Sequence, residues 1–159
     1  MPVREPTLSY RIVKRGAFNL KAVHNAIRSF LDEHQYDVEV KENTVKNKPQ
    51  GEEVLLKING DKKLDDYCKL YISTDFVITN LEKVKNHKSD IGDVRLIFKG
   101  WIVLDYRHNW EINKIGVWLR DNIYHKYFIK TKINTYYHVK VYEDAMELFA
   151  IVKDILGMT

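Results

Sequence analysis

The feature that most constrains this chain is a regular alternation of apolar residues in two long segments, 69–79 and 94–107. Successive side chains of a strand point to opposite faces, so each segment has one apolar face. In 69–79 the other face is polar, which is typical of an antiparallel strand with one side on a core and one side in water. The second segment has fourteen residues, about 46 Å at ~3.3 Å per residue, and Gly100 near its middle favours a bend or bulge. We therefore expect a strongly curved sheet.

Shorter alternating segments precede these two. The alternation predicts strands over 8–14, 36–41 and 54–58. The polar stretch 42–52, around Pro49-Gln50-Gly51, predicts a loop with frayed strand ends between the second and third of these strands. Asn59-Gly60 is a typical hairpin sequence and predicts a turn after the third strand, although the polar residues that follow it allow a wider turn.

Helical spacing appears at both ends of the chain. Asn19 is a suitable N-cap for a helix that ends near His34, and its apolar face would consist of Leu20, Val23, Ile27, Phe30 and Leu31. Two more helices are predicted after residue 110. Their apolar faces would consist of Ile112, Ile115, Leu119, Ile123 and Tyr127 in the first, and of Val141, Ala145, Leu148, Phe149, Val152, Ile155 and Leu156 in the second. An alternative stays open for the first, because Ile115, Val117 and Leu119 also alternate as in a strand.

These elements predict one α+β domain over residues 1–159. Its antiparallel sheet would have about five strands and would be strongly curved, with a helix from the N-terminal half and a C-terminal pair of helices covering it. This order of elements resembles that of helix-grip folds, in which a sheet wraps around a C-terminal helix and forms a ligand cavity. The likeness concerns the fold and says nothing about the ligand.

Composition argues against several kinds of function. Cys68 is the only cysteine, and the six histidines do not occur in metal-binding pairs such as His-Glu-x-x-His. The seven glycines form no phosphate-binding loop, and no serine stands in a nucleophile elbow. The sequence therefore predicts no catalytic residues, no metal site and no cofactor, and it favours a non-enzymatic protein. A catalytic site built from residues distant in the sequence stays open.

The same sequence favours a cytoplasmic protein. No apolar stretch approaches the ~20 residues that span a bilayer, so membrane insertion is disfavoured. The start of the chain lacks the apolar segment of a secretion signal, and one cysteine suits a reducing compartment.

The predicted apolar faces of sheet and helix suggest a ligand site. If the sheet curves around the last helix, these faces form a cup for a hydrophobic small molecule or a protein partner. The candidate residues are Phe76, Phe98, Ile102, Leu104, Met146 and Phe149. Our first hypothesis for function is therefore a binding module with this cup.

The alternative hypothesis is a domain that binds single-stranded RNA or another nucleic acid. Residues 107–140 contain seven Arg or Lys against Glu111 and Asp121, and the segment also contains seven aromatic residues. Cations suit phosphates and rings suit bases, so this composition is typical of a single-strand groove, although it also suits a helix on an anionic membrane. Neutralisation by the acidic last helix is a further possibility. The candidate residues are Arg107, Lys114, Arg120, Lys126, Lys130 and Lys132.

Two charged clusters have structural interpretations. Asp105, Arg107 and His108 come together at the end of the long strand and could form an acid–base or anion-binding site, but a surface ion pair at the end of a strand is the simpler interpretation. Asp65 and Asp66 are neighbours in a turn, where side chains usually point apart, so we expect a solvated turn.

Short motifs along most of the chain resemble a group of small archaeal α+β proteins without assigned function. The motifs are Asp65-Asp66-Tyr67, Asp105-Tyr106 followed by Trp110, Trp118-Leu119-Arg120, Tyr124 with Tyr127, and Ile151-Val152-Lys153. The resemblance implies a cytosolic α+β domain. It implies no activity and no site.

Overall fold

The computed structural model of this protein describes residues 2–48, 51–83 and 90–157. Five strands form one antiparallel sheet in the order β1-β5-β4-β3-β2. This confirms the predicted fold class. The strands are β1 (Val3–Phe18), β2 (Asp37–Lys48), β3 (Gly51–Lys63), β4 (Cys68–Lys83) and β5 (Asp90–Leu104).

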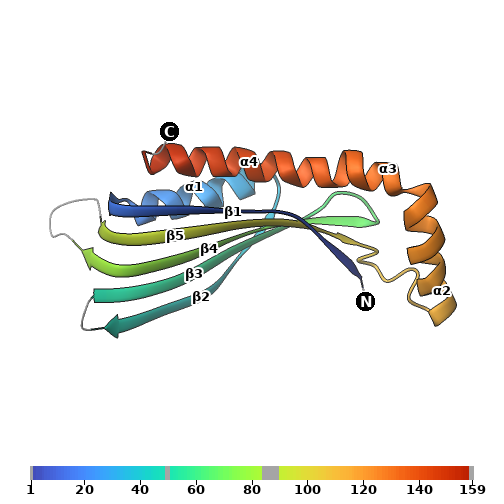
Figure 1. Ribbon diagram of the computed structural model, residues 1–159, viewed down its shortest axis with the longest axis horizontal. Helices are drawn as coiled ribbons and strands as arrows, with labels where there is room; N and C mark the ends of the chain where they lie inside the picture. Colours follow the sequence, from blue (N-terminus) through green and yellow to red (C-terminus); the bar gives the residue numbers. More distant parts are fainter. Residues whose placement is uncertain (1, 49–50, 84–89, 158–159) are drawn as a thin grey trace.

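Two helices lie against one face of the sheet, and no helix lies over the other face within the described residues (Figure 1). They are α1 (Leu20–Glu33) and α4 (His138–Ile155). The side chains between helices and sheet are the apolar members of the alternating segments, and all are buried: Ile72, Phe76, Ile78, Leu96, Phe98, Ile102 and Leu104. We call the side of the sheet that faces the helices the inner face and the opposite side the outer face.

The sheet bends along its length (Figure 1), and β1 has a bulge where it pairs with Gly100 of β5. The register of β1 shifts between Pro6 and Leu8, so the bulge lies in the strand opposite Gly100. A Cβ at Gly100 would lie 3.2 Å from the Leu8 side chain and 3.5 Å from that of Val141 on α4. The missing side chain therefore makes room for both the bulged strand and the helix.

Helix α1 begins where its cap predicts. The Asn19 side chain accepts a hydrogen bond from the Ala22 backbone N–H at 3.0 Å. Val23, Ile27, Phe30 and Leu31 are buried on one side of the helix, as the spacing predicts.

The tight hairpin turn predicted at Asn59-Gly60 is wrong, and the turn forms further on, in the polar stretch that allowed a wider turn. Asn59 and Gly60 lie inside β3, and the turn to β4 lies at residues 64–67. Gly60 instead allows α1 to pack closely on the sheet, because a Cβ there would lie 3.1 Å from the Leu31 side chain on α1. A glycine in a strand allows this close approach of the helix.

The loop predicted at residues 42–52 is also shorter than expected. β2 continues to Lys48 and β3 starts at Gly51, so paired strands fill most of this polar stretch. The backbone hydrogen bonds of a ladder do not depend on apolar side chains, so this polar stretch still pairs.

After β5 the chain is helical in consecutive segments. They are α2 (Lys114–Leu119), the π-helical η1 (Arg120–Phe128), α3 (Lys130–Lys132), the π-helical η2 (Ile133–Tyr137) and α4. The Asn113 side chain caps α2 by accepting from the Gly116 N–H at 2.7 Å, so the helical alternative holds there rather than the strand. No helix in the described part of the chain is long and apolar enough to cross a membrane.

The first of these C-terminal helices does not cover the sheet. Residues 112–128, which we call the arm, lie at one end of the sheet and run across the direction of α4 (Figure 1). Of the predicted apolar face, Leu119 and Ile123 are half-buried, whereas Ile112, Ile115 and Tyr127 are exposed. The apolar spacing therefore predicts the helix but not its environment.

Candidate functional site: the outer face of the sheet

The outer face is formed by the alternate residues that do not enter the core. The register places Lys69, Tyr71, Ser73, Asp75, Val77 and Thr79 of β4 there, beside Asp93, Arg95, Ile97, Lys99, Trp101 and Val103 of β5. β1 adds Arg4, Ser9, Arg11, Val13 and Arg15. Strand β4 has 16 residues, about 53 Å at ~3.3 Å per residue, so this face is long enough to contact an extended ligand.

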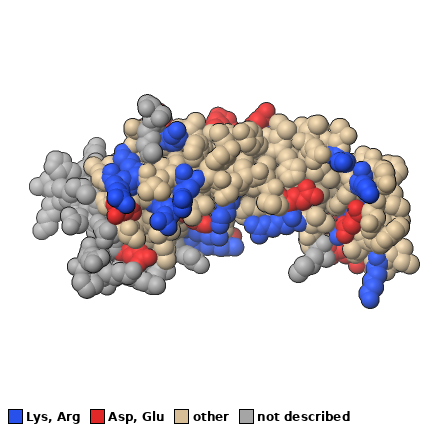
Figure 2. All heavy atoms as spheres, viewed as in Figure 1, with Lys and Arg blue, Asp and Glu red and all other residues tan. Residues whose placement is uncertain are grey.

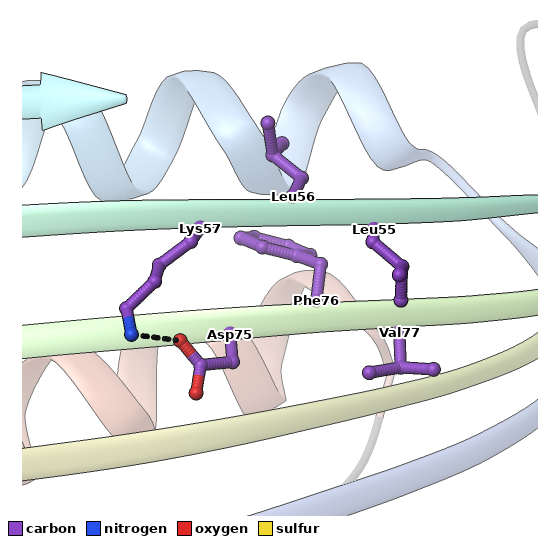
Figure 3. Close-up of a pocket in the computed structure, with 6 residues that line it drawn as sticks. All are labelled: Leu55, Leu56, Lys57, Asp75, Phe76 and Val77. Atoms are coloured by element: carbon purple, nitrogen blue, oxygen red, sulfur yellow. Dashed lines mark ion pairs between the residues drawn. The ribbon is translucent and has the colours of Figure 1, made fainter. Parts of the chain in front are cut away.

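Two shallow hollows lie side by side on this face and share Val77. The first has a volume of about 190 Å³ and is lined by Leu55, Leu56, Lys57, Asp75, Phe76 and Val77. Figure 3 shows Lys57 directed toward Asp75 and Leu55 facing Val77 across the two strands. The second has about 170 Å³ and is lined by Val13, Arg15, Val77, Thr79, Asp93, Val94 and Arg95. Both are too small to enclose a drug-sized ligand, which needs about 300–1,000 Å³.

Basic side chains outnumber acidic ones on this face. On β1, β5 and β4, six basic side chains face outward (Arg4, Arg11, Arg15, Lys69, Arg95 and Lys99) against two described acidic ones (Asp75 and Asp93). The excess is confined to these strands, because the described side chains of β2 and β3 add Lys41, Lys57 and Lys63 against Asp37, Glu39, Glu53 and Asp61, and Asp61 pairs with Lys69 at 3.1 Å. The Asp75 carboxylate lies between Lys57 at 3.7 Å and Lys99 at 3.3 Å, so it offsets only part of their charge.

Two of the cations have no carboxylate partner among the residues that the structure describes. No salt bridge within the described ranges involves Arg11 or Arg95, and both side chains are exposed. Arg15 makes only a long contact with Asp93, at 3.9 Å, and its side chain is 84% exposed. Figure 2 shows Lys and Arg side chains on the side of the molecule below α4, where the outline is hollowed beside the arm. An anion would therefore meet cations that are not already neutralised.

Planar side chains form a column across three strands at one end of this face. The rings of Tyr71 and Trp101 are stacked, with centroids 5.4 Å apart and planes within 4°. The Arg4 guanidinium lies 4.1 Å from the Trp101 ring centroid, and the Lys69 ammonium lies 5.8 Å from that of Tyr71. Such cation–π pairs hold basic groups beside aromatic surface.

Of the six residues predicted for the hydrophobic cup, four lie along the inner face of the sheet and two, Met146 and Phe149, lie on α4. Phe76, Phe98, Ile102 and Leu104 are buried, and Met146 and Phe149 are half-buried. The Phe98 and Phe149 rings meet edge to face with centroids 5.6 Å apart, so sheet and helix are in direct contact there. Ligand binding by these residues stays a prediction.

The six residues predicted for nucleic acid binding are not brought together as one surface. Arg120 is buried, Arg107 pairs with Asp66 at 2.8 Å, and Lys132 pairs with Asp65 at 3.2 Å. The other three, Lys114, Lys126 and Lys130, are exposed on or beside the arm. Part of the basic charge of residues 107–140 is therefore neutralised within the molecule.

Arg120 joins the arm to the end of the sheet through carboxylates. Its guanidinium lies 3.2 Å from Asp105, which is fully buried, and 2.8 Å from Asp121. Asp105 has a positive φ of 56° and also accepts the backbone N–H groups of Asn109 and Trp110. The surface ion pair expected at this strand end is therefore a buried one, and Arg120 is its cation.

The neighbouring carboxylates Asp65 and Asp66 point apart, as expected for a turn. Asp66 is exposed, whereas Asp65 accepts hydrogen bonds from the Tyr67 and Cys68 backbone N–H groups and from the Tyr137 hydroxyl. Burial alone would raise the pKa of Asp65, but these hydrogen bonds and the Lys132 ammonium outweigh it and lower the pKa. This carboxylate is therefore a structural anchor between the turn and η2.

His125 lies on the side of the arm that faces the end of the sheet. Its Nε2 hydrogen-bonds to the Tyr67 hydroxyl, and its Nδ1 lies 3.9 Å from Asp121. Burial lowers the pKa of His125 below its ordinary value of 6.5; the Asp121 carboxylate opposes this shift and the Arg120 guanidinium adds to it. The imidazole is therefore neutral at pH 7.

This histidine predicts a loss of stability in mild acid. Its folded pKa is lower than its unfolded pKa, so the unfolded chain binds the proton more readily, and stability is lost as the pH falls from about 6.5 through the lower folded pKa. We expect urea unfolding of wild type and His125→Gln between pH 7.5 and 5 to show a flatter pH dependence for the variant. Because the pKa of His24 is lowered as well, His24→Gln measures the share of that residue. Parallel pH curves for wild type and His125→Gln would contradict this role.

No group of three or more His, Cys, Asp or Glu suited to a metal ion occurs in the described part of the chain. Comparison with known protein families and with curated proteins finds no match for this sequence. The resemblance to small archaeal proteins stays a prediction, and the geometry of the outer face is the basis for function.

The sequence interpretation did not select the outer-face residues. The signal was present, because Arg11, Arg95 and Lys99 occupy the polar positions of alternating segments. Their relevance depended on whether a helix covers that face, which strand alternation alone does not determine.

Proposed function

We propose that this protein binds single-stranded nucleic acid through the outer face of its sheet. The observation that carries the proposal is the set of exposed cations without carboxylate partners, above all Arg11 and Arg95, on a sheet face that no described helix covers. Phosphate groups supply a regular line of negative charge that such a face can follow.

The aromatic column supports a nucleic acid over other polyanions. The Trp101 ring is held between Tyr71 and the Arg4 guanidinium, so a base would stack at an end of this column, on Arg4 or on Tyr71, where a phosphate is bound nearby. An acidic protein would also contact the cations, but its carboxylates would not stack on the rings beside them. We place the protein in the cytoplasm as part of the same proposal, since a single buried thiol fits a reducing compartment.

Charge reversal on the outer face should abolish most of the binding. We expect Arg11→Glu with Arg95→Glu to weaken binding of a fluorescein-labelled 20-nucleotide oligo(U) by about tenfold or more at low salt. The slope of log K against log salt should fall by about 0.7 for each phosphate group that the variant no longer binds. Fluorescence anisotropy from 25 to 200 mM NaCl measures both quantities.

Exposed lysines on and beside the arm provide a matched control. Lys126→Glu with Lys130→Glu makes the same change in net charge on a different surface. We expect this variant to retain most of the affinity and to lose only the general electrostatic attraction. Wild type that does not bind oligo(U) at 25 mM NaCl would refute the proposal, and a larger loss in the arm variant would favour residues 107–140 as the nucleic acid site.

A further inference from the structure

Five large apolar side chains of the arm are exposed. Exposed fractions are 88% for Ile112, 69% for Ile115, 57% for Trp118, 71% for Tyr127 and 73% for Phe128. Scattered exposed apolar residues are ordinary, but a contiguous group marks an interaction site.

These residues are left exposed because the opposite side of the arm packs against the end of the sheet. Arg120 and His125 attach that side to the sheet end through Asp105 and Tyr67, and Trp110 and Tyr124 pack there with ring centroids 5.0 Å apart. Ile115 and Trp118 are three residues apart and lie on one side of α2, and Ile112 lies in the turn just before that helix. The outward side of the arm therefore exposes two apolar groups, Ile112, Ile115 and Trp118 at its start and Tyr127 with Phe128 at its end, separated by the exposed polar residues Asp121 and Asn122.

We propose that the outward side of the arm docks on a second copy of this chain. The three exposed rings alone offer about 400 Å² at ~200 Å² for each aromatic side chain, before the two isoleucines are added. A stable interface needs about 800 Å² from each partner. The arm supplies much of that area, and a contact made twice in a symmetric dimer would supply the rest.

Charge indicates which surface of the second copy the arm contacts. Lys114 is next to Ile115 in the sequence, the Lys126 ammonium lies 5.7 Å from the Tyr127 ring centroid, and Lys130 follows the arm; all three lysines are exposed. The outward side of α4 has the opposite sign, with exposed Glu143 and Glu147. It is also apolar in part, because Tyr136, Val139 and Tyr142 are 41–48% exposed.

The arm and α4 therefore form complementary halves of one contact on the same chain. In a twofold dimer the arm of each protomer would lie on α4 of the other. This leaves the outer face of the sheet free, so the dimer and the proposed nucleic acid site are independent.

Light scattering after size-exclusion chromatography tests the proposal on the full chain. The chain has a mass of 18.9 kDa, so we expect twice that value at micromolar concentrations. Trp118→Glu with Phe128→Glu should give a monomer and raise the dimer dissociation constant at least a hundredfold. Its circular dichroism and melting curve should remain those of a folded protein.

A charge swap tests the same contact even if Trp118→Glu with Phe128→Glu is unstable. Lys126→Glu with Lys130→Glu should weaken the homodimer, and so should Glu143→Lys with Glu147→Lys. Mixing the two variants should restore a heterodimer, because both contacts then join opposite charges. Glu147 also lies 3.6 Å from His34 of the same chain. Glu143→Lys alone keeps this contact and therefore serves as the milder variant.

Three results would overturn the proposal. One is a wild-type protein that stays monomeric at 100 µM. The second is a dimer whose mass does not respond to the arm or α4 variants. The third is a monomer that sediments with phosphatidylserine vesicles and loses this binding in Trp118→Glu with Phe128→Glu, which would assign the arm to an anionic membrane surface instead.

Discussion

Replacing Arg120 by Met is expected to cost about 3–5 kcal/mol of unfolding free energy, because the substitution leaves a buried carboxylate without its cation. Asp105 is fully buried and Arg120 is 3% exposed, so water cannot substitute for the guanidinium. The arm should also detach from the sheet end, since Arg120 bridges Asp105 and Asp121. Urea denaturation followed by circular dichroism measures the free energy.

Two comparison variants separate the buried charge from other effects. Arg107→Met removes a cation whose side chain is 52% exposed and whose partner Asp66 is 86% exposed, so it should cost about 0–1 kcal/mol. Arg120→Met combined with Asp105→Asn should be more stable than Arg120→Met alone, because Asn keeps an acceptor for the Asn109 N–H without the charge. If Arg120→Met costs no more than Arg107→Met, the ion pair does not anchor the arm.

Phe98→Ala is expected to cost about 3–5 kcal/mol, as truncation of a packed core aromatic does. Phe98 is 1% exposed on the inner face, and its ring contacts Phe149 of α4. The substitution would remove both the transfer free energy of the ring and its packing against the helix. The same denaturation experiment measures it.

The matched control is the same substitution on the surface. Phe128→Ala changes a ring that is 73% exposed, so its cost should stay below about 1 kcal/mol. A hydrophobic dye added to wild type tests the predicted cup, because a ligand that binds the folded state raises the melting temperature. A small cost for Phe98→Ala together with a dye-dependent rise would show that sheet and helix enclose a ligand site, contrary to the packed core we expect.

Local patterns in the sequence determined most of the elements. The alternation in 69–79 and 94–107 predicted β4 and β5, and Asn19 with the apolar spacing after it predicted α1. These predictions succeed because a side chain's direction follows from its place in a strand or helix, whatever the rest of the chain does. The sheet, its antiparallel pairing and the helices against it followed from the same patterns.

Tertiary contacts decided the rest, because they join residues far apart in the chain. Gly60 looks like a turn residue until Leu31 packs against it, and Arg120 looks like a surface cation until Asp105 is buried beside it. The exposed side of the arm could not be predicted from spacing, since apolar periodicity marks a face without showing what covers it. The sequence thus determined which residues share a face, and only the tertiary structure decided which faces are buried and which remain free to bind.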